Sequence, residues 1–314
     1  MRIRDKIKKP KRPVVVYEIL PPRERDGTLN LYAETISSLL SQTHIDAINI
    51  PEIREEDSRG ERPILNQNRG EPREFGRLLQ DIVGVEAIIN RVVVHNTYEN
   101  QLKWFEETHK KYEIENMIIV GGESSKVKYI GPTVNEVLEA VSYRYNSDGG
   151  DIFCGGIAIP TRVNESKNLI KKSSYGSEFF TTQVLCDSEN IIKMIDRYQI
   201  RCDELDTFPR RILLSFAPVS SIKNIQFLKW LGVEIPKETE RYLLGRPGSM
   251  TERSLDISIE VLNKILDYII EKKIKVPIGL NVEHIMSYNF QSSVEMLQEL
   301  ARIYREFCIK SNHY

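Results

Sequence analysis

The sequence predicts an α/β fold, a single (β/α)8 barrel of the TIM type with a helical insert before the last strand. Three observations support this. Short β-branched runs alternate with longer amphipathic runs along all 314 residues, which is typical of repeated strand–helix units. No G-x-G-x-x-G fingerprint follows the first strand, which disfavours a doubly wound open sheet. No Pro/Gly/Ser-rich linker divides the chain, so residues 1–314 are interpreted as one domain.

Eight short segments rich in β-branched and aromatic residues predict the strands. They are VVVYEIL (14–20), DAINI (46–50), EAIINRVVV (86–94), NMIIVGG (116–122), DIFCGGIAI (151–159), EFFTTQVL (178–185), RILLSFAP (211–218) and VPIGLNV (276–282). The first is apolar on both faces except at Glu18, as expected of a strand covered by helices outside and packed side chains inside. Its alternation leaves open which face is the lumen.

The helices are predicted between these strands. Helical stretches include 28–42, 98–111, 132–144, 164–175, 187–198 and 220–231, followed by an insert over 236–273. Within the insert, SMTE (249–252) has capping-box spacing and precedes apolar residues at helical period. We therefore interpret the insert as structural.

Composition excludes several classes of partner. With 44 Lys+Arg against 45 Asp+Glu the net charge is -1, so no nucleic-acid or membrane partner is indicated. The basic start MRIRDKIKKPKR is interpreted as a frayed, solvated terminus. Four dispersed cysteines and no apolar run of about 20 residues predict a soluble protein of the reducing cytoplasm without a metal site. A homo-oligomer remains possible.

Glu18 is the first candidate functional residue. It lies near the C-terminal end of the first strand, where barrel enzymes keep their catalytic groups. An ionised carboxylate in an apolar interior is costly unless it is paired or protonated. Position alone leaves two alternatives, a catalytic acid or a structural carboxylate tied to a backbone donor or an arginine.

Several motifs resemble one family in the right order. YEILPPR (17–23) resembles the F-E-F-F-P-P opening of the methylenetetrahydrofolate reductases, flavin-dependent barrels that reduce the methylene group of a reduced pterin to methyl. IIVGGES (118–124) resembles their A-L-R-G-D, and NLIKKSSYGSEFFTTQVLCD (168–187) resembles N-L-K-x-K-x-x-x-G-A-x-x-x-x-T-Q-x-x-x-D. APVSSIKNIQFLKWLGVEIP (217–236) resembles P-V-x-x-x-K-x-x-x-F with its following I-P. The resemblance covers nearly the whole chain.

The resemblance implies roles for individual residues. Glu18 would be the general acid that protonates the pterin-side-chain nitrogen N10, and Glu123 and Gln183 would bind the pterin substrate. The expected contacts to FAD are Gly122, Glu165, Asn168, Lys171 and Lys172. The residues alone also leave alternatives: Gln183 bonded to a neighbouring barrel side chain, GGESSK as a surface turn, and Lys171 with Lys172 as a solvated helix face.

Other positions depart from the family pattern. Asn90 replaces a histidine, Gly121 an arginine and Val282 an arginine, and the loop after the fifth strand is shortened. His95, Glu283 and His284 are new polar residues at the same strand ends. No local histidine pair suggests a metal, so each histidine is expected to be hydrogen-bonded near the barrel mouth. These departures remove several of the flavin contacts that the resemblance implies.

The resemblance implies an oxidoreductase of one-carbon metabolism and methionine biosynthesis. It would reduce 5,10-methylene-tetrahydrofolate or a related tetrahydropterin to the 5-methyl form, with hydride from NAD(P)H through FAD. Two alternatives stay open. One is a flavin-free relative that passes hydride directly to the pterin, and the other is a non-catalytic pterin-binding subunit.

Overall fold

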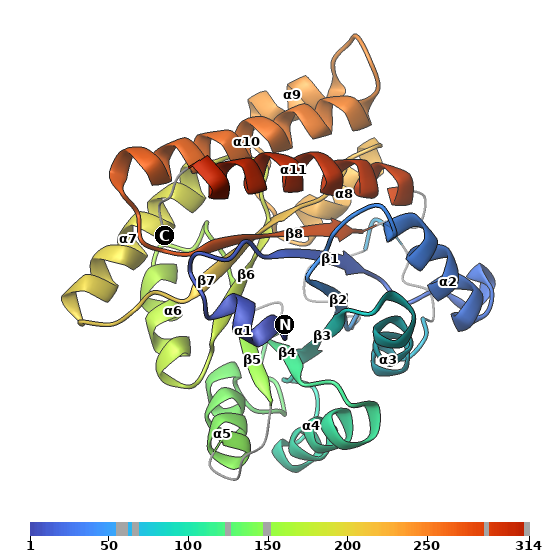
Figure 1. Ribbon diagram of the computed structural model, residues 1–314, viewed down its shortest axis with the longest axis vertical. Coiled ribbons are helices and arrows are strands. Elements are labelled where there is room, and N and C mark those ends of the chain that lie inside the picture. The colour runs from blue at the N-terminus through green and yellow to red at the C-terminus, as the bar shows by residue number, and fades with distance from the viewer. Residues whose placement is uncertain (55–61, 65–68, 123–126, 147–151, 286–288, 311–314) are drawn as a thin grey trace.

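The computed structural model describes residues 1–54, 62–64, 69–122, 127–146, 152–285 and 289–310. Within them, eight parallel strands close into a barrel in chain order (Figure 1), so the predicted (β/α)8 barrel is confirmed. The strands are β1 (Val15–Ile19), β2 (Ala47–Pro51), β3 (Glu86–Val92), β4 (Asn116–Val120), β5 (Phe153–Ala158), β6 (Phe179–Val184), β7 (Arg211–Phe216) and β8 (Ile278–His284).

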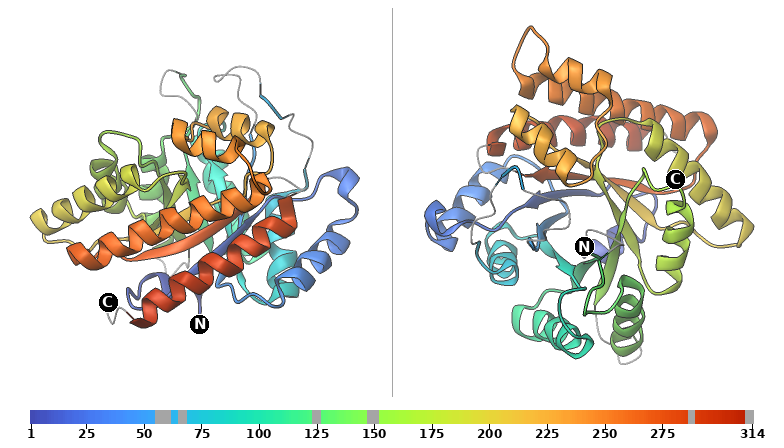
Figure 2. Two further views of the ribbon diagram at one scale, coloured as in Figure 1. Left: turned by 90° about the horizontal axis from the view of Figure 1, so that it is seen from above. Right: turned by 180° about the vertical axis from the view of Figure 1, so that it is seen from behind.

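Helices cover the outside of the barrel in both views of Figure 2. The strand-connecting helices are α2 (Leu29–Leu40), α3 (Pro72–Val83), α4 (Tyr98–Tyr112), α5 (Val134–Asn146), α6 (Glu165–Ser174), α7 (Glu189–Glu204) and α8 (Ile222–Trp230), with a short 3-10 turn η1 (Glu24–Asp26) after β1. The helix α11 (Phe290–Lys310) follows β8 and packs against it. In the described part of the chain, no helix is long and apolar enough to cross a bilayer.

The predicted insert consists of two helices, α9 (Lys237–Leu244) and α10 (Met250–Lys272). The capping box that starts α10 is confirmed by its two bonds. The Ser249 amide donates to Glu252 Oε2 at 2.7 Å, and the Glu252 amide donates to Ser249 Oγ at 3.1 Å. These bonds satisfy two backbone donors that the first turn of a helix otherwise leaves unpaired.

The two faces of β1 belong to different parts of the core. Val14 and Val16 pack inside the barrel with residues such as Phe179 and Leu213, whereas Val15 and Tyr17 pack against the outer helices. Because side chains alternate along a strand, Glu18 has the parity of Val16 and faces the lumen. The structure thus resolves the choice of face that the sequence left open.

The N-terminus differs from its prediction as a frayed tail. Residues Ile3–Ile7 form the helix α1, which lies over the middle of the barrel in Figure 1. Ile3 and Ile7 are buried in the cluster that fills the barrel interior. Their spacing of four residues places both on one face of the helix, so this basic segment closes the N-terminal opening of the barrel with its apolar side.

Candidate active site

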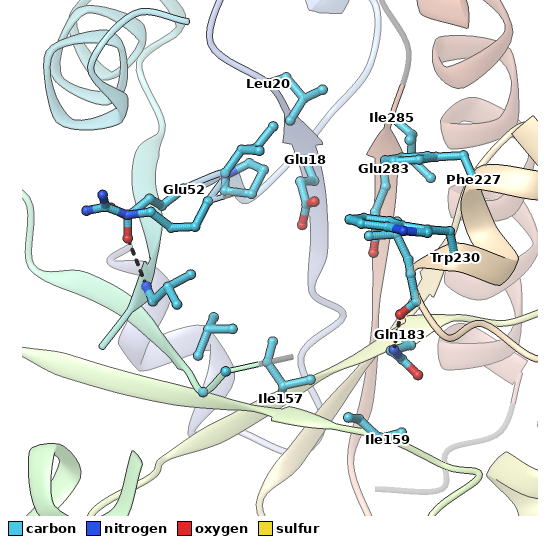
Figure 3. Close-up of a pocket in the computed structure, with 18 of the residues that line it drawn as sticks. Glu18, Leu20, Glu52, Ile157, Ile159, Gln183, Phe227, Trp230, Glu283 and Ile285 are labelled. Atoms are coloured by element: carbon cyan, nitrogen blue, oxygen red, sulfur yellow. Dashed lines mark hydrogen bonds and ion pairs between the residues drawn. The ribbon is translucent and has the colours of Figure 1, made fainter. Parts of the chain in front are cut away.

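A pocket of about 470 Å³ opens where the C-terminal ends of the strands meet (Figure 3). Glu18, Gln183 and Glu283 contribute polar groups, and Ile157 and Trp230 belong to its apolar walls. This size is within the range of about 300–1,000 Å³ that is usual for a small-molecule site. Catalytic residues of barrel enzymes lie at this end of the strands, so the pocket is the candidate active site.

Glu18 projects into the pocket from β1. Its Oε2 accepts from Asn49 Nδ2 of β2 at 2.5 Å and from Asn281 Nδ2 of β8 at 3.3 Å. Burial raises the pKa of Glu18 from 4.5 to about 7, although the hydrogen bonds from the side chains of Asn281 and Asn49 lower it. The carboxyl group can therefore hold or release a proton near neutral pH.

Glu283 is the second carboxyl group of the pocket and is the register partner of Glu18 across the β1–β8 pair. Its Oε1 accepts from Asn281 Nδ2 at 3.4 Å, and the Ser215 side chain also bonds to it. Burial, and after it the negative charge of Glu18, raises the pKa of Glu283 well above 4.5. Sequence reasoning noted Glu283 only as a new polar residue.

Gln183, predicted to bind the pterin, lies on β6 and lines the pocket. Its Nε2 donates to the carbonyl oxygen of Leu231 at 3.2 Å. This bond uses one of the two amide hydrogens and does not involve the amide oxygen. The side chain is thus fixed at the pocket wall while it retains hydrogen-bonding capacity towards a ligand.

Gly122 and Glu123 were predicted at the end of the fourth strand. Glu123 lies outside the described residues. Gly122 lines the pocket, and a Cβ added there would lie 2.2 Å from Tyr129 Cζ. The ring of Tyr129 thus packs closely over Gly122, and a larger residue there would require the ring to move.

Three of the four residues predicted for the FAD ribityl and diphosphate groups, Glu165, Asn168 and Lys172, form a hydrogen-bonded cluster on α6. Glu165 is 1% exposed, and its carboxylate accepts from Asn168 Nδ2 at 3.0 Å and from Lys172 Nζ at 3.3 Å. Lys172 Nζ also donates to the Ile157 carbonyl oxygen at 2.5 Å. Burial lowers the pKa of Lys172, opposed by the charge of Glu165. Lys171 is exposed and does not line the pocket.

In this arrangement the cluster offers little to the diphosphate of a bound FAD. A diphosphate requires cations whose donors turn towards it. Lys172 instead donates to a backbone carbonyl and to the carboxylate of Glu165, which is shielded from solvent. The pocket wall at β3 to β5 is apolar and consists of Val92, Val120 and Ile157. The wall offers no side-chain donor from these three residues to the polar edge of a flavin.

Two aromatic rings of α8 form another wall. Phe227 and Trp230 are stacked with centroids 6.0 Å apart and planes 11° apart, and the Arg62 guanidinium lies 5.1 and 5.3 Å from the two centroids. All three side chains line the pocket. A flat ligand can stack on such a surface. Their spacing of three residues on one helix was visible in the sequence, but nothing in it identified Arg62 as their neighbour.

The asparagines that hold Glu18 were also missed by sequence reasoning. Asn49 and Asn281 are each the single polar residue within an apolar strand segment, DAINI and VPIGLNV respectively, apart from the leading aspartate of the first. This is the same signal that identified Glu18. Both are 1% exposed and both bond to it.

The two histidines at the strand ends pack against aromatic rings. His284 is buried, with its ring edge-on to Phe290 at 5.2 Å, and His95 is edge-on to Tyr129 at 5.6 Å. Among the described residues, no group of three His, Cys, Asp or Glu side chains is arranged to hold a metal ion.

Comparison with known proteins identifies relatives of this barrel. The family model for methylenetetrahydrofolate reductase matches residues 2–299. Comparison with the curated proteins gave no match. A solved structure described as an uncharacterized protein from Clostridium thermocellum that binds two copies of 5-methyl-5,6,7,8-tetrahydrofolic acid is 20% identical, with a TM-score of 0.78 over 96% of this chain and 99% of that one. A GH113 β-1,4-mannanase is 10% identical, with a TM-score of 0.51 over 95% and 98% of the two chains. At these identities the likenesses to solved structures show the fold alone.

Proposed function

Because the chain belongs to the methylenetetrahydrofolate reductase family, we propose that it reduces the methylene group of a 5,10-methylene-tetrahydropterin to a methyl group, with Glu18 as the general acid. The observation that carries the proposal is the placement of Glu18. Its carboxyl group faces the lumen at a strand end, inside a pocket of ligand size, and its pKa is raised to about 7 by burial. General acids work best when their pKa is near the operating pH.

The proposed reaction consumes one proton and one hydride. Glu18 donates its proton to N10 of the pterin as the bond between N10 and the methylene carbon breaks, which leaves a cationic iminium group on N5. Hydride from a reduced nicotinamide then adds to the methylene carbon and gives the methyl product. The ionised Glu18 left after proton transfer attracts the iminium cation because the buried site screens charges weakly.

The choice of a tetrahydropterin as substrate class has two supports. One is membership of the family, and the other is the C. thermocellum structure with its two bound 5-methyl-tetrahydrofolate molecules. The stacked Phe227–Trp230 pair and the amide of Gln183 provide the two types of contact that a pterin with an aromatic side chain needs.

We propose direct hydride transfer from the nicotinamide to the pterin, without FAD, because the α6 cluster offers little to a diphosphate. In this version the pocket holds the two substrates and Glu18 supplies the proton. Reduction through FAD is the second candidate. A purified protein with stoichiometric flavin absorbance that methylene-pterin reoxidises would support that candidate and contradict direct transfer.

The proposed function is tested by incubating the purified chain with methylene-tetrahydrofolate and each reduced nicotinamide. Mass spectrometry of the pterin is expected to show the 5-methyl product, with nicotinamide oxidised in equal amount. Binding of the pterin without turnover would instead indicate a non-catalytic pterin-binding subunit.

Lys172→Met is expected to destabilise the protein by roughly 2 kcal/mol, because it removes the nearer cation from the buried carboxylate of Glu165 and leaves only Arg162, whose Nη1 lies 4.0 Å from Glu165 Oε2. Lys171→Met is the matched control on the same helix, and since Lys171 is exposed we expect a change of about 0.5 kcal/mol or less. Urea unfolding measures both. If Lys172→Met leaves stability unchanged and instead abolishes flavin binding, the α6 cluster is a diphosphate site.

Gln183→Ala is expected to weaken pterin binding by about tenfold, the loss of roughly one hydrogen bond from a partly buried site. The Kd for the methyl-pterin product, measured by calorimetry, gives this effect separately from catalysis. Gln183→Glu keeps the shape and the acceptors but loses the donor to the Leu231 carbonyl. Unchanged affinity in Gln183→Ala would show that Gln183 only anchors the loop at Leu231.

A further inference from the structure

Glu18 and Glu283 place two carboxyl groups side by side at the mouth of the barrel. Parallel pairing of β1 with β8 puts their Cα atoms in register, and both side chains line the same pocket. Figure 3 shows the two side chains on neighbouring strands of the pocket. The proposed function uses only one of them.

The pair shares a hydrogen-bond donor. Asn281 Nδ2 lies 3.3 Å from Glu18 Oε2, 3.4 Å from Glu283 Oε1 and 3.0 Å from Ser215 Oγ. One amide nitrogen with two hydrogens cannot satisfy three acceptors fully. The site is thus better suited to one negative charge than to two.

The side-chain amides of Asn49 and Asn281 can serve either protonation state of the pair. Within the described residues, the Oδ1 atoms of Asn49 and Asn281 are buried and have no hydrogen-bond partner. A side-chain amide donates through its nitrogen to an ionised carboxylate, and after a half-turn it accepts through its oxygen from a protonated one. The two asparagines can therefore support either protonation state of the carboxyl groups.

We propose that Glu283 is a positioning residue that shares a proton with Glu18, so that the carboxyl pair, rather than Glu18 alone, keeps the acid available for reduction of the pterin. This inference rests on the proposed function of the pocket. Glu283 acts through Glu18, which is the group that contacts N10.

Electrostatics give the pair two separate ionisations. Burial raises both pKa values, and the negative charge formed on one carboxyl group opposes ionisation of the other. Among the described residues that line the pocket, the other ionisable side chains are Glu52 and His284 and the cations Arg54, Arg62, Arg69, Arg162 and Lys172. Glu52 is paired with Arg91 at 2.7 Å, Arg54 with Glu52 at 2.7 Å and Lys172 with Glu165 at 3.3 Å.

The proton balance of turnover follows from this. Above the first ionisation the pair carries one proton and one negative charge, and the proton moves between the two carboxyl groups. When it is on Glu18 it transfers to N10 as the carbon–nitrogen bond breaks. The pair is then reloaded by one proton from water before the next turnover.

The test is the pH dependence of the single-turnover rate of methyl-pterin formation in wild type and Glu283→Gln. In Glu283→Gln, Glu18 loses the neighbouring negative charge that opposes its ionisation, so at about pH 9 a smaller fraction of it is expected to be protonated than in wild type. We therefore expect Glu283→Gln to be slower than wild type by about tenfold or more at about pH 9, but within about threefold at about pH 6. The alkaline limb of the pH–rate profile is the fall in rate as pH rises. If this limb has the same shape in both proteins, the proposal is overturned.

Two further variants make this result specific. Glu283→Asp keeps a carboxyl group that can share a proton, so we expect it to show the wild-type alkaline limb. If Glu283 had a purely structural role, the shorter aspartate would not be expected to do so. Glu240→Gln removes a carboxylate outside the pocket, paired with Lys229 at 2.7 Å, and should leave the limb's shape unchanged. The proposal is wrong if Glu283→Asp behaves like Glu283→Gln, or if Glu240→Gln shifts the limb as well.

Infrared titration of the carboxylic acid stretch provides a readout that needs no activity. Wild type is expected to lose two buried carboxylic acids in separate steps, whereas Glu18→Gln and Glu283→Gln each lose one acid at a pH below the upper wild-type step. If no variant reduces the pterin but these steps are seen, the proposed function fails and the proton-sharing pair stands. If the remaining glutamate titrates alike with and without its partner, the pair does not share a proton.

Discussion

Glu18→Gln is expected to slow reduction of the methylene-pterin by about 10²-fold or more, because glutamine keeps the shape and the amide contacts but has no proton to transfer to N10. The single-turnover rate of methyl-pterin formation measures the effect. Glu18→Asp retains a transferable proton on a shorter side chain and should recover part of the rate. Binding of the methyl-pterin product should change little in either variant.

The stability of Glu18→Gln distinguishes a catalytic acid from a structural carboxylate. The pKa of Glu18 is about 7 in the folded state and near 4.5 when the chain is unfolded, so the unfolded state ionises first as pH rises. The stability present below the unfolded pKa is therefore lost as pH rises towards 7. Glutamine does not ionise, so at about pH 8 we expect the variant to unfold at the same temperature as wild type or higher. A clear loss of stability at that pH would identify Glu18 as a structural residue.

Arg211→Met is expected to destabilise the fold by roughly 3 kcal/mol, because it removes four side-chain hydrogen bonds of a buried guanidinium, among them the bond to the buried carbonyl of Ile7. The Arg211 side chain is 2% exposed. It donates to the carbonyls of Ile7, Lys9 and Pro10 at 3.1, 2.7 and 3.2 Å and also to that of Ile278. These bonds tie the N-terminal segment to the barrel at the end opposite the pocket.

Arg210→Met is the matched control for Arg211→Met. Arg210 is the neighbouring residue, its side chain is 40% exposed, and it pairs with Glu178 at 2.8 Å. A surface ion pair contributes about 0–1 kcal/mol, so only a small change is expected. Urea unfolding measures both variants, and equal effects would contradict the structural role assigned to Arg211.

The strands could be predicted from the sequence because each is buried on both faces and therefore forms a continuous apolar run. Every predicted strand lies within two residues of the observed ends, as for 116–122 against Asn116–Val120. The N-terminal helix was not predicted because its charged residues outnumber its two isoleucines. Ile3 and Ile7 are buried only because the closed barrel has an opening at that end, which the sequence does not reveal.

Part of the candidate site could be predicted for the same reason. Glu18 and Gln183 are polar residues within apolar strands, so their position near the barrel mouth follows from strand alternation and strand direction. The role of Lys172 could not be predicted in this way. A lysine on an amphipathic helix has the same sequence pattern whether it turns to solvent or, as here, reaches inwards to the Ile157 carbonyl and Glu165.

The proposed reduction by direct hydride transfer is tested most directly by a deuterium label. The purified chain is incubated with methylene-tetrahydrofolate and a nicotinamide deuterated at the transferring hydrogen, and the methyl-pterin product is analysed by mass spectrometry. We predict one deuterium in the methyl group of every product molecule, since the label passes straight from carbon to carbon. A methyl product without deuterium would contradict direct transfer, because a hydrogen carried on a flavin nitrogen exchanges with water. Failure to form any methyl product from the bound pterin would contradict the proposed reduction itself.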